Sequence, residues 1–177
     1  FRWRSGDTPL LCGLHRLRDY DRSQPLYIVE GETDALTLWT HGYQAIGVPG
    51  ASTWKPEWAE PLAGFEHVYV VVEPDQGGAA LTERLKGSSL VDRVRLINME
   101  DLSGYDHLFI KDVNDLHRAD PDHFEERLVE LTASSVSLME ICSDETERVA
   151  QEAWEQCKDI AAKADILGYA AGVIGRT

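Results

Sequence analysis

Three short apolar runs of the sequence each end in acidic side chains, and these are the residues best suited to chemistry. Glu30 follows the first run, Glu73 and Asp75 follow the second, and Asp112 follows the third. Runs of this length, rich in β-branched residues, are typical of buried parallel strands, whose carboxyl ends meet at one edge of a sheet. Ligands bind at that edge in open α/β sheets. Because clustered carboxylates repel one another, a cation with oxygen ligands such as Mg²⁺ is expected between them.

The first acidic segment places a glutamate directly before a glycine. Gly31 has no side chain to cover the carboxylate of Glu30, so Glu30 is predicted to be functional. Asp34 falls in the first turn of the helix that follows. It can serve the same site or, with about equal weight, cap the helix N-terminus.

The second segment pairs two acids that are two residues apart. In an extended chain Glu73 and Asp75 point the same way, so they can share one ion or bind two adjacent ones. Gly77 and Gly78 then present bare backbone N–H groups at a helix N-terminus, which suits a phosphate. The alternative is an acidic turn whose glycines serve only to bend the chain.

The third segment contributes accessory candidates: Lys111, Asp112, Asn114 and Asp115. Lys111 can neutralise a phosphate or pair with a neighbouring acid. Asn114 or Asp115 can instead cap the short helix that follows. The six histidines lack the HExxH or paired spacing of a zinc site, so each is predicted to be structural or solvated.

Strand and helix patterns alternate from residue 26 onward. This order predicts βαβ units, and hence an α/β fold with a mainly parallel sheet and helices on both faces. The predicted strands are 26–30, 44–48, 67–72, 93–97 and 107–110, and the predicted helices are 34–40, 54–62, 77–86 and 121–132.

A long helix is predicted near the end of the chain, from Glu145 to Leu167. Its apolar positions recur every three or four residues, which forms one stripe: Val149, Ala153, Cys157, Ile160, Ala164 and Leu167. We therefore expect three segments, namely a lead-in over 1–23, the α/β domain over 24–135, and a helical linker or docking arm over 136–177.

Charge and composition narrow the function. A formal net charge of −14 argues against a broad basic surface that binds nucleic acid. One local exception is residues 1–22, which are either a solvated arm or a nucleic-acid contact through Arg2, Arg4, Arg16, Arg18 and Arg22. Three dispersed cysteines, with no apolar run as long as a membrane span and no signal sequence, predict a soluble cytoplasmic protein without a membrane partner.

The three acidic segments together resemble the Toprim domain, a metal-binding module shared by bacterial-type primases, topoisomerases and some nucleases. The resemblance rests on Val-Glu-Gly-Glu-Thr-Asp-Ala-Leu at 29–36, on Glu-Pro-Asp at 73–75 with its Gly-Gly, and on Lys-Asp-Val-Asn-Asp-Leu at 111–116. Spacing and the last motif are most similar to primases and primase-helicases of phages and mobile elements. The resemblance covers roughly residues 24–132.

The resemblance implies a Rossmann-like Toprim fold and a nucleotidyltransferase role in DNA replication. Glu30 would be the general acid/base or a metal ligand, and Glu73 and Asp75 would fall on the family's Asp-x-Asp pair that holds Mg²⁺, with Mn²⁺ as a substitute. Glu73 departs from that pattern by one methylene. The implied partners are DNA, nucleotides and a helicase-like ATPase domain of a larger protein, and the fragment alone is expected to be inactive.

Other readings stay open at this stage. A Toprim module can also be non-catalytic and serve nucleic-acid or protein contacts, or it can belong to a nuclease. Response-regulator receivers and haloacid-dehalogenase phosphatases also place acids at strand ends. Both of these require an aspartate where this chain has Glu73.

Overall fold

The computed structural model describes residues 6, 8–99 and 110–174, and it describes their side chains except at 51 and 160–174. Residues 107–109 of the predicted strand 107–110 therefore lie outside the described residues, as do Arg2 and Arg4. Ile110 is described, and it lies outside any strand.

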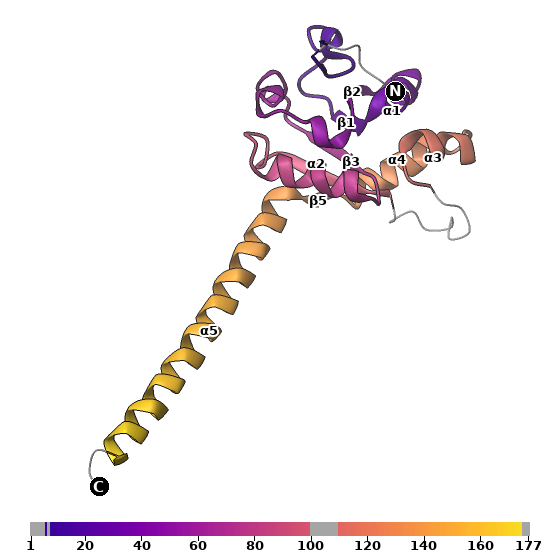
Figure 1. The fold of residues 1–177 in the computed structure, drawn as a ribbon. Coiled ribbons are helices and arrows are strands. Elements are labelled where there is room, and N and C mark those ends of the chain that lie inside the picture. The colour runs from indigo at the N-terminus through magenta and orange to yellow at the C-terminus, as the bar shows by residue number, and fades with distance from the viewer. Residues whose placement is uncertain (1–5, 7, 100–109, 175–177) are drawn as a thin grey trace. The chain divides into compact units, whose positions relative to one another are not determined.

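A five-stranded sheet forms the centre of the fold, with strand order β2-β1-β3-β4-β5 (Figure 1). Its first four strands pair in parallel and confirm the predicted mainly parallel sheet, whereas β5 pairs antiparallel with β4. The sequence did not predict β5, because two residues are too short to show an alternating pattern. The strands are β1 (Leu26–Glu30), β2 (Gln44–Val48), β3 (Val68–Val72), β4 (Val94–Asn98) and β5 (Val136–Ser137).

Five α-helices accompany the sheet in the described part of the chain: α1 (Gly31–Thr40), α2 (Gln76–Lys86), α3 (Val113–Ala119), α4 (Phe124–Ala133) and α5 (Leu138–Ile174). Short 3-10 helices cover Leu14–Arg16, Ala51–Thr53, Pro56–Trp58 and Glu60–Leu62. The predicted helix 54–62 is therefore wrong in type, since this stretch forms two 3-10 turns. Pro61 has no N–H for an α-helical hydrogen bond, which explains the break.

Alternation along the strands divides the core between the two faces of the sheet. Tyr27 and Val29 of β1 belong to a buried cluster with residues of α1, α3 and α4. Leu26 and Ile28 point to the opposite face and are fully buried. On that face α2 packs against β3. Because both faces are covered, the strands read as continuous apolar runs, as parallel strands usually do.

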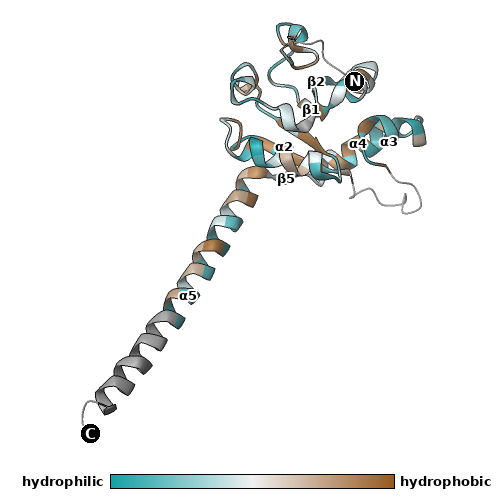
Figure 2. Ribbon diagram, in the orientation of Figure 1, coloured by the Kyte–Doolittle hydropathy of each residue, from teal (hydrophilic) through white to brown (hydrophobic). Residues whose placement is uncertain are grey.

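The chain divides into two compact units, residues 1–139 and residues 140–177. The second unit contains most of α5, and hydrophilic and hydrophobic residues are interspersed along the coloured part of this helix in Figure 2. Val149 and Trp154 are 56% and 60% exposed. Packing of the predicted apolar stripe stays a prediction, because the side chains at 160, 164 and 167 lie outside the described residues. Within the described ranges, no helix is both long and apolar enough to cross a membrane.

Candidate metal centre

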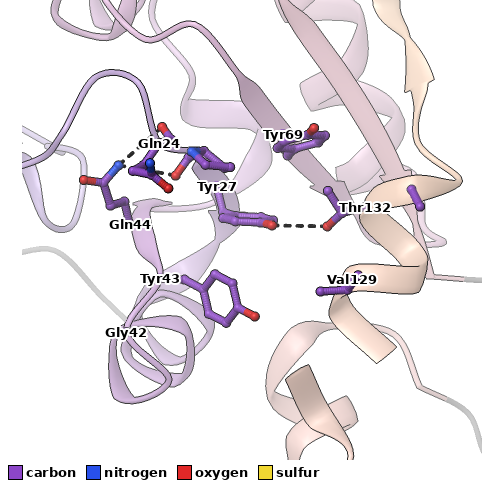
Figure 3. Close-up of a pocket in the computed structure, with 10 residues that line it drawn as sticks. Gln24, Tyr27, Gly42, Tyr43, Gln44, Tyr69, Val129 and Thr132 are labelled. Carbon is purple, nitrogen blue, oxygen red and sulfur yellow. Dashed lines mark hydrogen bonds between the residues drawn. The ribbon is translucent and has the colours of Figure 1, made fainter. Parts of the chain in front are cut away.

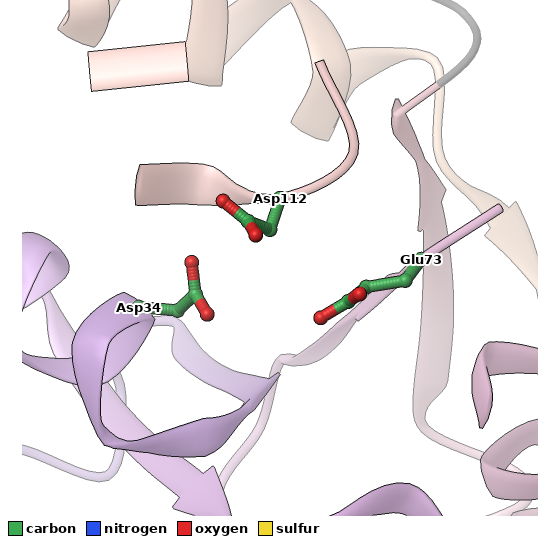
Figure 4. A group of neighbouring side chains, drawn as sticks. All are labelled: Asp34, Glu73 and Asp112. Carbon is green, nitrogen blue, oxygen red and sulfur yellow. The ribbon is translucent and has the colours of Figure 1, made fainter. Parts of the chain in front are cut away.

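Three carboxylates converge at the carboxyl edge of the sheet: Asp34, Glu73 and Asp112. One oxygen of each lies within 4.8 Å of the others, and Figure 4 shows the three side chains pointing toward a common space. They come from the first turn of α1, from the residue after β3, and from the residue before α3. Carboxylates from three separate elements therefore meet where parallel strands end.

Asp34 is positioned by a contact between helices. Gly31, at the turn from β1 into α1, has φ of +84°, a backbone conformation that side chains disfavour. Asp34 follows within the first turn of α1 and is 3% exposed. Its Oδ1 accepts a 2.9 Å hydrogen bond from the backbone N–H of Asn114. This bond joins α1 to α3, so Asp34 does not act as the cap of its own helix.

Glu73 is held where the start of α2 touches the end of β3. A Cβ at Gly78 would lie 2.2 Å from the carbonyl oxygen of Glu73, so only glycine permits this approach. Asp75 is the N-cap of α2, and its Oδ1 accepts hydrogen bonds of 2.7 Å and 3.0 Å from the N–H groups of Gly77 and Gly78. The N–H groups predicted to bind phosphate therefore already bond to Asp75.

Asp112 is both a member of the carboxylate cluster and the N-cap of α3. Its Oδ1 accepts a 2.7 Å hydrogen bond from the N–H of Asp115. The alternative that Asn114 or Asp115 caps this helix is therefore wrong, because the cap lies before the helix begins. Asp115 instead lies 3.9 Å from Arg118 in an ion pair.

Burial and mutual repulsion raise the pKa values of two acids of the cluster, Asp34 and Glu73. Burial is the main cause that raises the pKa of Asp34 to about 7, and the charges of Asp112 and Glu73 raise it further. The N–H of Asn114 and the Lys111 ammonium act in the opposite direction. The pKa of Glu73 is also raised, mainly by burial. The cluster thus concentrates more negative charge than its surroundings stabilise.

Lys111 is the cation beside this cluster. Its Nζ lies 3.1 Å from Asp112 Oδ2 and 3.4 Å from Glu73 Oε2, while its side chain is 45% exposed. The hydrogen bond to Asp112 is the main cause that raises the pKa of Lys111. Lys111 therefore compensates the cluster from the side of Asp112 and Glu73, whereas Asp34 is contacted by the backbone N–H of Asn114.

The donor set fits a hard divalent cation. All three groups offer carboxylate oxygens, the ligands that Mg²⁺ and Mn²⁺ prefer, and one or two carboxylates with several waters is the usual environment of Mg²⁺. The raised pKa of Asp34 supports this fit, because a cation would favour the ionised carboxylate that burial disfavours.

The predicted site residues are distributed unevenly around this centre. Glu73 belongs to the cluster, as do Asp34 and Asp112, which were predicted only as accessory residues. Glu30 ends β1 and Asp75 caps α2, and neither belongs to the cluster among the described residues. Asp34 and Asp112, which the sequence placed only among the accessory residues, both lie within a few residues of a strand end or a helix start. Their convergence depends on how α1 packs against α3.

The described arginines of the N-terminal segment contact the protein itself. The Arg16 guanidinium lies 4.1 Å from the ring centroid of Trp39. Arg18 forms an ion pair with Asp19, and both side chains are well exposed. Arg22 donates a 2.9 Å hydrogen bond to the Pro61 carbonyl oxygen. A nucleic-acid role for these arginines stays a prediction.

Apart from the carboxylate cluster, a cavity of about 660 Å³ lies near the amino ends of the strands (Figure 3). Tyr27, Tyr43 and Tyr69 line it, and the Tyr27 hydroxyl lies 3.2 Å from Thr132 Oγ1. None of its described lining residues is charged. It therefore lacks the groups that bind a phosphate or a metal, and the carboxylate cluster is the better candidate for chemistry.

Similar sequences come from phage and archaea. The Gene 57 protein of Mycobacterium phage D29 is 32% identical over 96 residues, which cover 54% of this chain and 60% of that protein. The DNA primase DnaG of Pyrobaculum arsenaticum is 32% identical over 77 residues, which cover 43% of this chain and 19% of the primase. No protein-family model matches the chain. The chain thus spans less than two thirds of these relatives.

Solved structures show where the same fold occurs. The catalytic core of E. coli primase aligns with a TM-score of 0.53 at 21% identity, covering 72% of this chain and 40% of that core. The primase fragment of the bacteriophage T7 primase-helicase protein aligns with a TM-score of 0.52 at 24% identity, covering 67% of this chain and 48% of that fragment. At these identities the alignments establish a shared fold.

Proposed function

We propose that this chain carries a Toprim domain and is the Mg²⁺-binding module of a DNA primase or primase-helicase-like replication protein. Its sequence is similar to that of a DNA primase, and its fold is shared with a primase catalytic core. The observation that carries the proposal is the convergence of Asp34, Glu73 and Asp112 within 4.8 Å at the carboxyl edge of the sheet. In this role the module positions nucleotide phosphates for phosphoryl transfer, as part of a larger protein that binds DNA.

The three carboxylates of the cluster would hold the ion. Bound Mg²⁺ would neutralise phosphate oxygens and stabilise the charge that develops during phosphoryl transfer. Lys111, already beside Glu73 and Asp112, is placed to contact an incoming phosphate from the partly exposed side of the site. The protein's own contribution is thus to gather negative charge in a fixed geometry and to supply one cation at its rim.

Glu30, Asp75 and the glycines of α2 complete the proposal. We assign to Glu30 the general acid/base or metal-ligand role, since it ends β1 on the same edge of the sheet. Asp75 contributes to the raised pKa of Glu73, and we assign it to an adjacent ion. Phosphate binding at Gly77 and Gly78 then requires that the phosphate displaces the Asp75 carboxylate from their N–H groups.

Metal titration tests the proposal. Mg²⁺ or Mn²⁺ should raise the melting temperature of the 177-residue protein by mass action, and Asp112→Asn should respond much less. Asp92→Asn is the matched control, because Asp92 is an exposed acid paired with Arg93 outside the cluster. Equal shifts in all three proteins would show that the ions bind elsewhere and would overturn the proposal.

A second candidate is a non-catalytic interaction module. Lys111 favours it, because its ammonium already lies against two of the three acids and can substitute for a metal ion. If this candidate is correct, Lys111→Ala should destabilise the protein and added Mg²⁺ should not restore the loss. If the site binds metal, Lys111→Ala should instead leave a protein that Mg²⁺ stabilises more strongly than it stabilises the wild type.

A further inference from the structure

Polar contacts connect α1 to α3 at three levels beside the carboxylate cluster. At the first level Asn114 donates its backbone N–H to Asp34. At the second, the Thr37 hydroxyl donates to Asn114 Oδ1 at 3.3 Å. At the third, His41 Nε2 and His117 Nδ1 lie 3.1 Å apart. We call these three contacts the α1–α3 ladder.

Helix geometry places these contacts on one face of each helix. Positions 34, 37 and 41 follow one another at intervals of three and four residues, so their side chains share a face of α1. Asn114 and His117, three residues apart, share a face of α3. The contacts therefore form a continuous row that begins at Asp34 of the carboxylate cluster and runs along α1 to His41, the residue after its end.

The outer end of the ladder is packed from a third helix. The His41 ring stacks on the Phe124 ring with centroids 4.1 Å apart, and the His117 ring meets the same phenyl edge-on at 5.7 Å. Glu125 Oε1 lies 3.7 Å from His41 Nδ1. Phe124, at the start of α4, thus packs against both histidine rings. The two rings form a hydrogen bond when one of the facing nitrogens, His41 Nε2 or His117 Nδ1, carries a proton and the other does not.

The α1–α3 ladder counteracts the electrostatic repulsion between the carboxylates of Asp34 and Asp112, which lie at its cluster end. Asp34 belongs to α1 and Asp112 caps α3, so the separation of these two helices determines the separation of the two carboxylates. Like charges this close push apart, and burial strengthens the effect. Contacts that hold the helices together therefore hold the acids together as well.

We propose that Thr37, Asn114 and the His41–His117 pair are positioning residues, which fix the spacing of Asp34 and Asp112 and so give the centre its preference for Mg²⁺ over Ca²⁺. The proposal rests on the proposed metal-binding function. Mg²⁺ demands near-ideal octahedral geometry at short distances, whereas Ca²⁺ accepts longer and more variable ones. A loosened ladder should therefore weaken Mg²⁺ binding more than Ca²⁺ binding.

Thr37 provides the sharpest test, because the chain contains a matched control. The Thr37 hydroxyl shares its single proton between the Thr33 carbonyl oxygen, at 3.0 Å, and Asn114 Oδ1, at 3.3 Å. The Thr40 hydroxyl donates to the Leu36 carbonyl oxygen within α1. Thr37→Val and Thr40→Val thus lose the same bond within α1, but only Thr37→Val loses a ladder contact. Thr37→Ser keeps the hydroxyl and serves as the conservative rescue.

Calorimetric titration with Mg²⁺ and with Ca²⁺ supplies the measurement. We expect Thr37→Val to weaken Mg²⁺ binding about tenfold, as loss of a group that orients a ligand commonly does, and to weaken Ca²⁺ binding less than about twofold. Thr40→Val and Thr37→Ser should match the wild type for both ions. A merely structural role for Thr37 would leave the ratio of the two affinities unchanged and would overturn its assignment as a positioning residue.

A histidine variant tests the outer end of the ladder independently. His117→Ala should also lower the ratio of Mg²⁺ to Ca²⁺ affinity, whereas His15→Ala, at an exposed position on the 3-10 helix Leu14–Arg16, should not. A wild-type protein that binds neither ion would overturn the proposed function and this inference together. A wild type that binds Mg²⁺, with an unchanged ratio in both Thr37→Val and His117→Ala, would overturn this inference alone.

Discussion

At the scale of single residues, Asp34 is the acid of the cluster that its surroundings perturb most clearly. It is almost fully buried, its pKa is raised to about 7, and the two acids beside it add to the shift. In the unfolded chain the pKa of this carboxyl returns to its ordinary value of 3.8. Without a metal, the folded protein therefore keeps a proton on Asp34 at pH values where the unfolded chain has lost it.

This difference predicts how metal-free stability depends on pH. Because a raised carboxyl pKa favours the protonated folded state, the contribution of Asp34 to stability falls as pH rises from about 4 to about 7. Asp34→Asn keeps an oxygen that can accept the Asn114 hydrogen bond, and it removes the charge. At pH 8 we expect the variant to be more stable than wild type by about 1 to 3 kcal/mol, since each pKa unit corresponds to about 1.4 kcal/mol.

Urea unfolding in the presence of a chelator, at several pH values, measures this effect. Asp92→Asn, an exposed acid outside the cluster, should follow the wild-type profile. The interpretation of Asp34 would be wrong if Asp34→Asn and wild type lost stability in parallel between pH 4 and pH 7.

At the scale of elements, acidic residues cap the N-termini of two helices beside the carboxylate cluster. Asp112 caps α3 and Asp75 caps α2 through side-chain oxygens. One aspartate therefore contributes to both the cluster and the helix start, so local folding and site geometry are coupled at Asp112. Asp75 separates the two roles, because it caps α2 without belonging to the described cluster.

Substitution of Asp75 should distinguish capping from metal binding. Asp75→Ala removes the acceptor for two backbone N–H groups and should lower stability by about 1 kcal/mol, whereas Asp75→Asn should cost much less because asparagine also caps well. If Asp75 binds an adjacent ion as proposed, Asp75→Asn should still reduce the Mg²⁺-induced rise in melting temperature. Denaturant unfolding and thermal titration measure the two effects, and equal stability of the alanine and asparagine variants would contradict the cap.

The last helix is the other element that makes a prediction. Side-chain pairs such as Arg148–Glu152, at 2.6 Å, support α5 by only a few tenths of a kcal/mol each. An isolated helix is seldom stable in water, so we expect the apolar stripe of α5 to pack on the first unit or on a second copy. Deletion of residues 140–177 should therefore lower stability or change the association state, as seen by calorimetry and light scattering. A truncated protein with neither change would count against this expectation.

At the scale of the whole molecule, charge limits what the module does alone. The formal net charge of −14 opposes approach of a nucleic-acid backbone, and the described arginines Arg16 and Arg22 already contact the protein's own aromatic rings. The chain also spans only part of its primase relatives. If the proposed function is correct, we therefore expect other parts of a larger protein to bind the nucleic-acid template.

We expect the 177-residue protein to make no primers from Mg²⁺, nucleotides and single-stranded template. Any DNA binding should be weak and should fall steeply with added salt, because it depends on a few arginines that replace counterions. Primer extension assays and binding isotherms at several salt concentrations check both points. Template-dependent synthesis by this chain, or binding that ignores salt, would refute the division of labour.

The sequence by itself determined the class of fold and the edge of the sheet where the carboxylates gather. The spans of β1 and β2 follow directly from apolar runs that end in Glu30 and Val48, because a strand buried on both faces needs a continuous apolar stretch. The placement of Glu73 after β3 follows from the same pattern. These features depend on the order of apolar and polar residues within a few positions of one another, which can be read directly from the sequence.

Only the tertiary structure decided which acids lie close enough together to share one ion. Asp34 and Asp112 lie on helices far apart in sequence, and they meet because α1 and α3 pack with one particular separation and rotation. The same packing pairs His41 with His117, although their spacing suggested no such partnership. Whether side chains converge depends on the angles between packed helices and strands. It also depends on which group binds each carboxylate oxygen, as at Asp75, whose Oδ1 accepts hydrogen bonds from Gly77 and Gly78. Local patterns in the sequence contain neither kind of information.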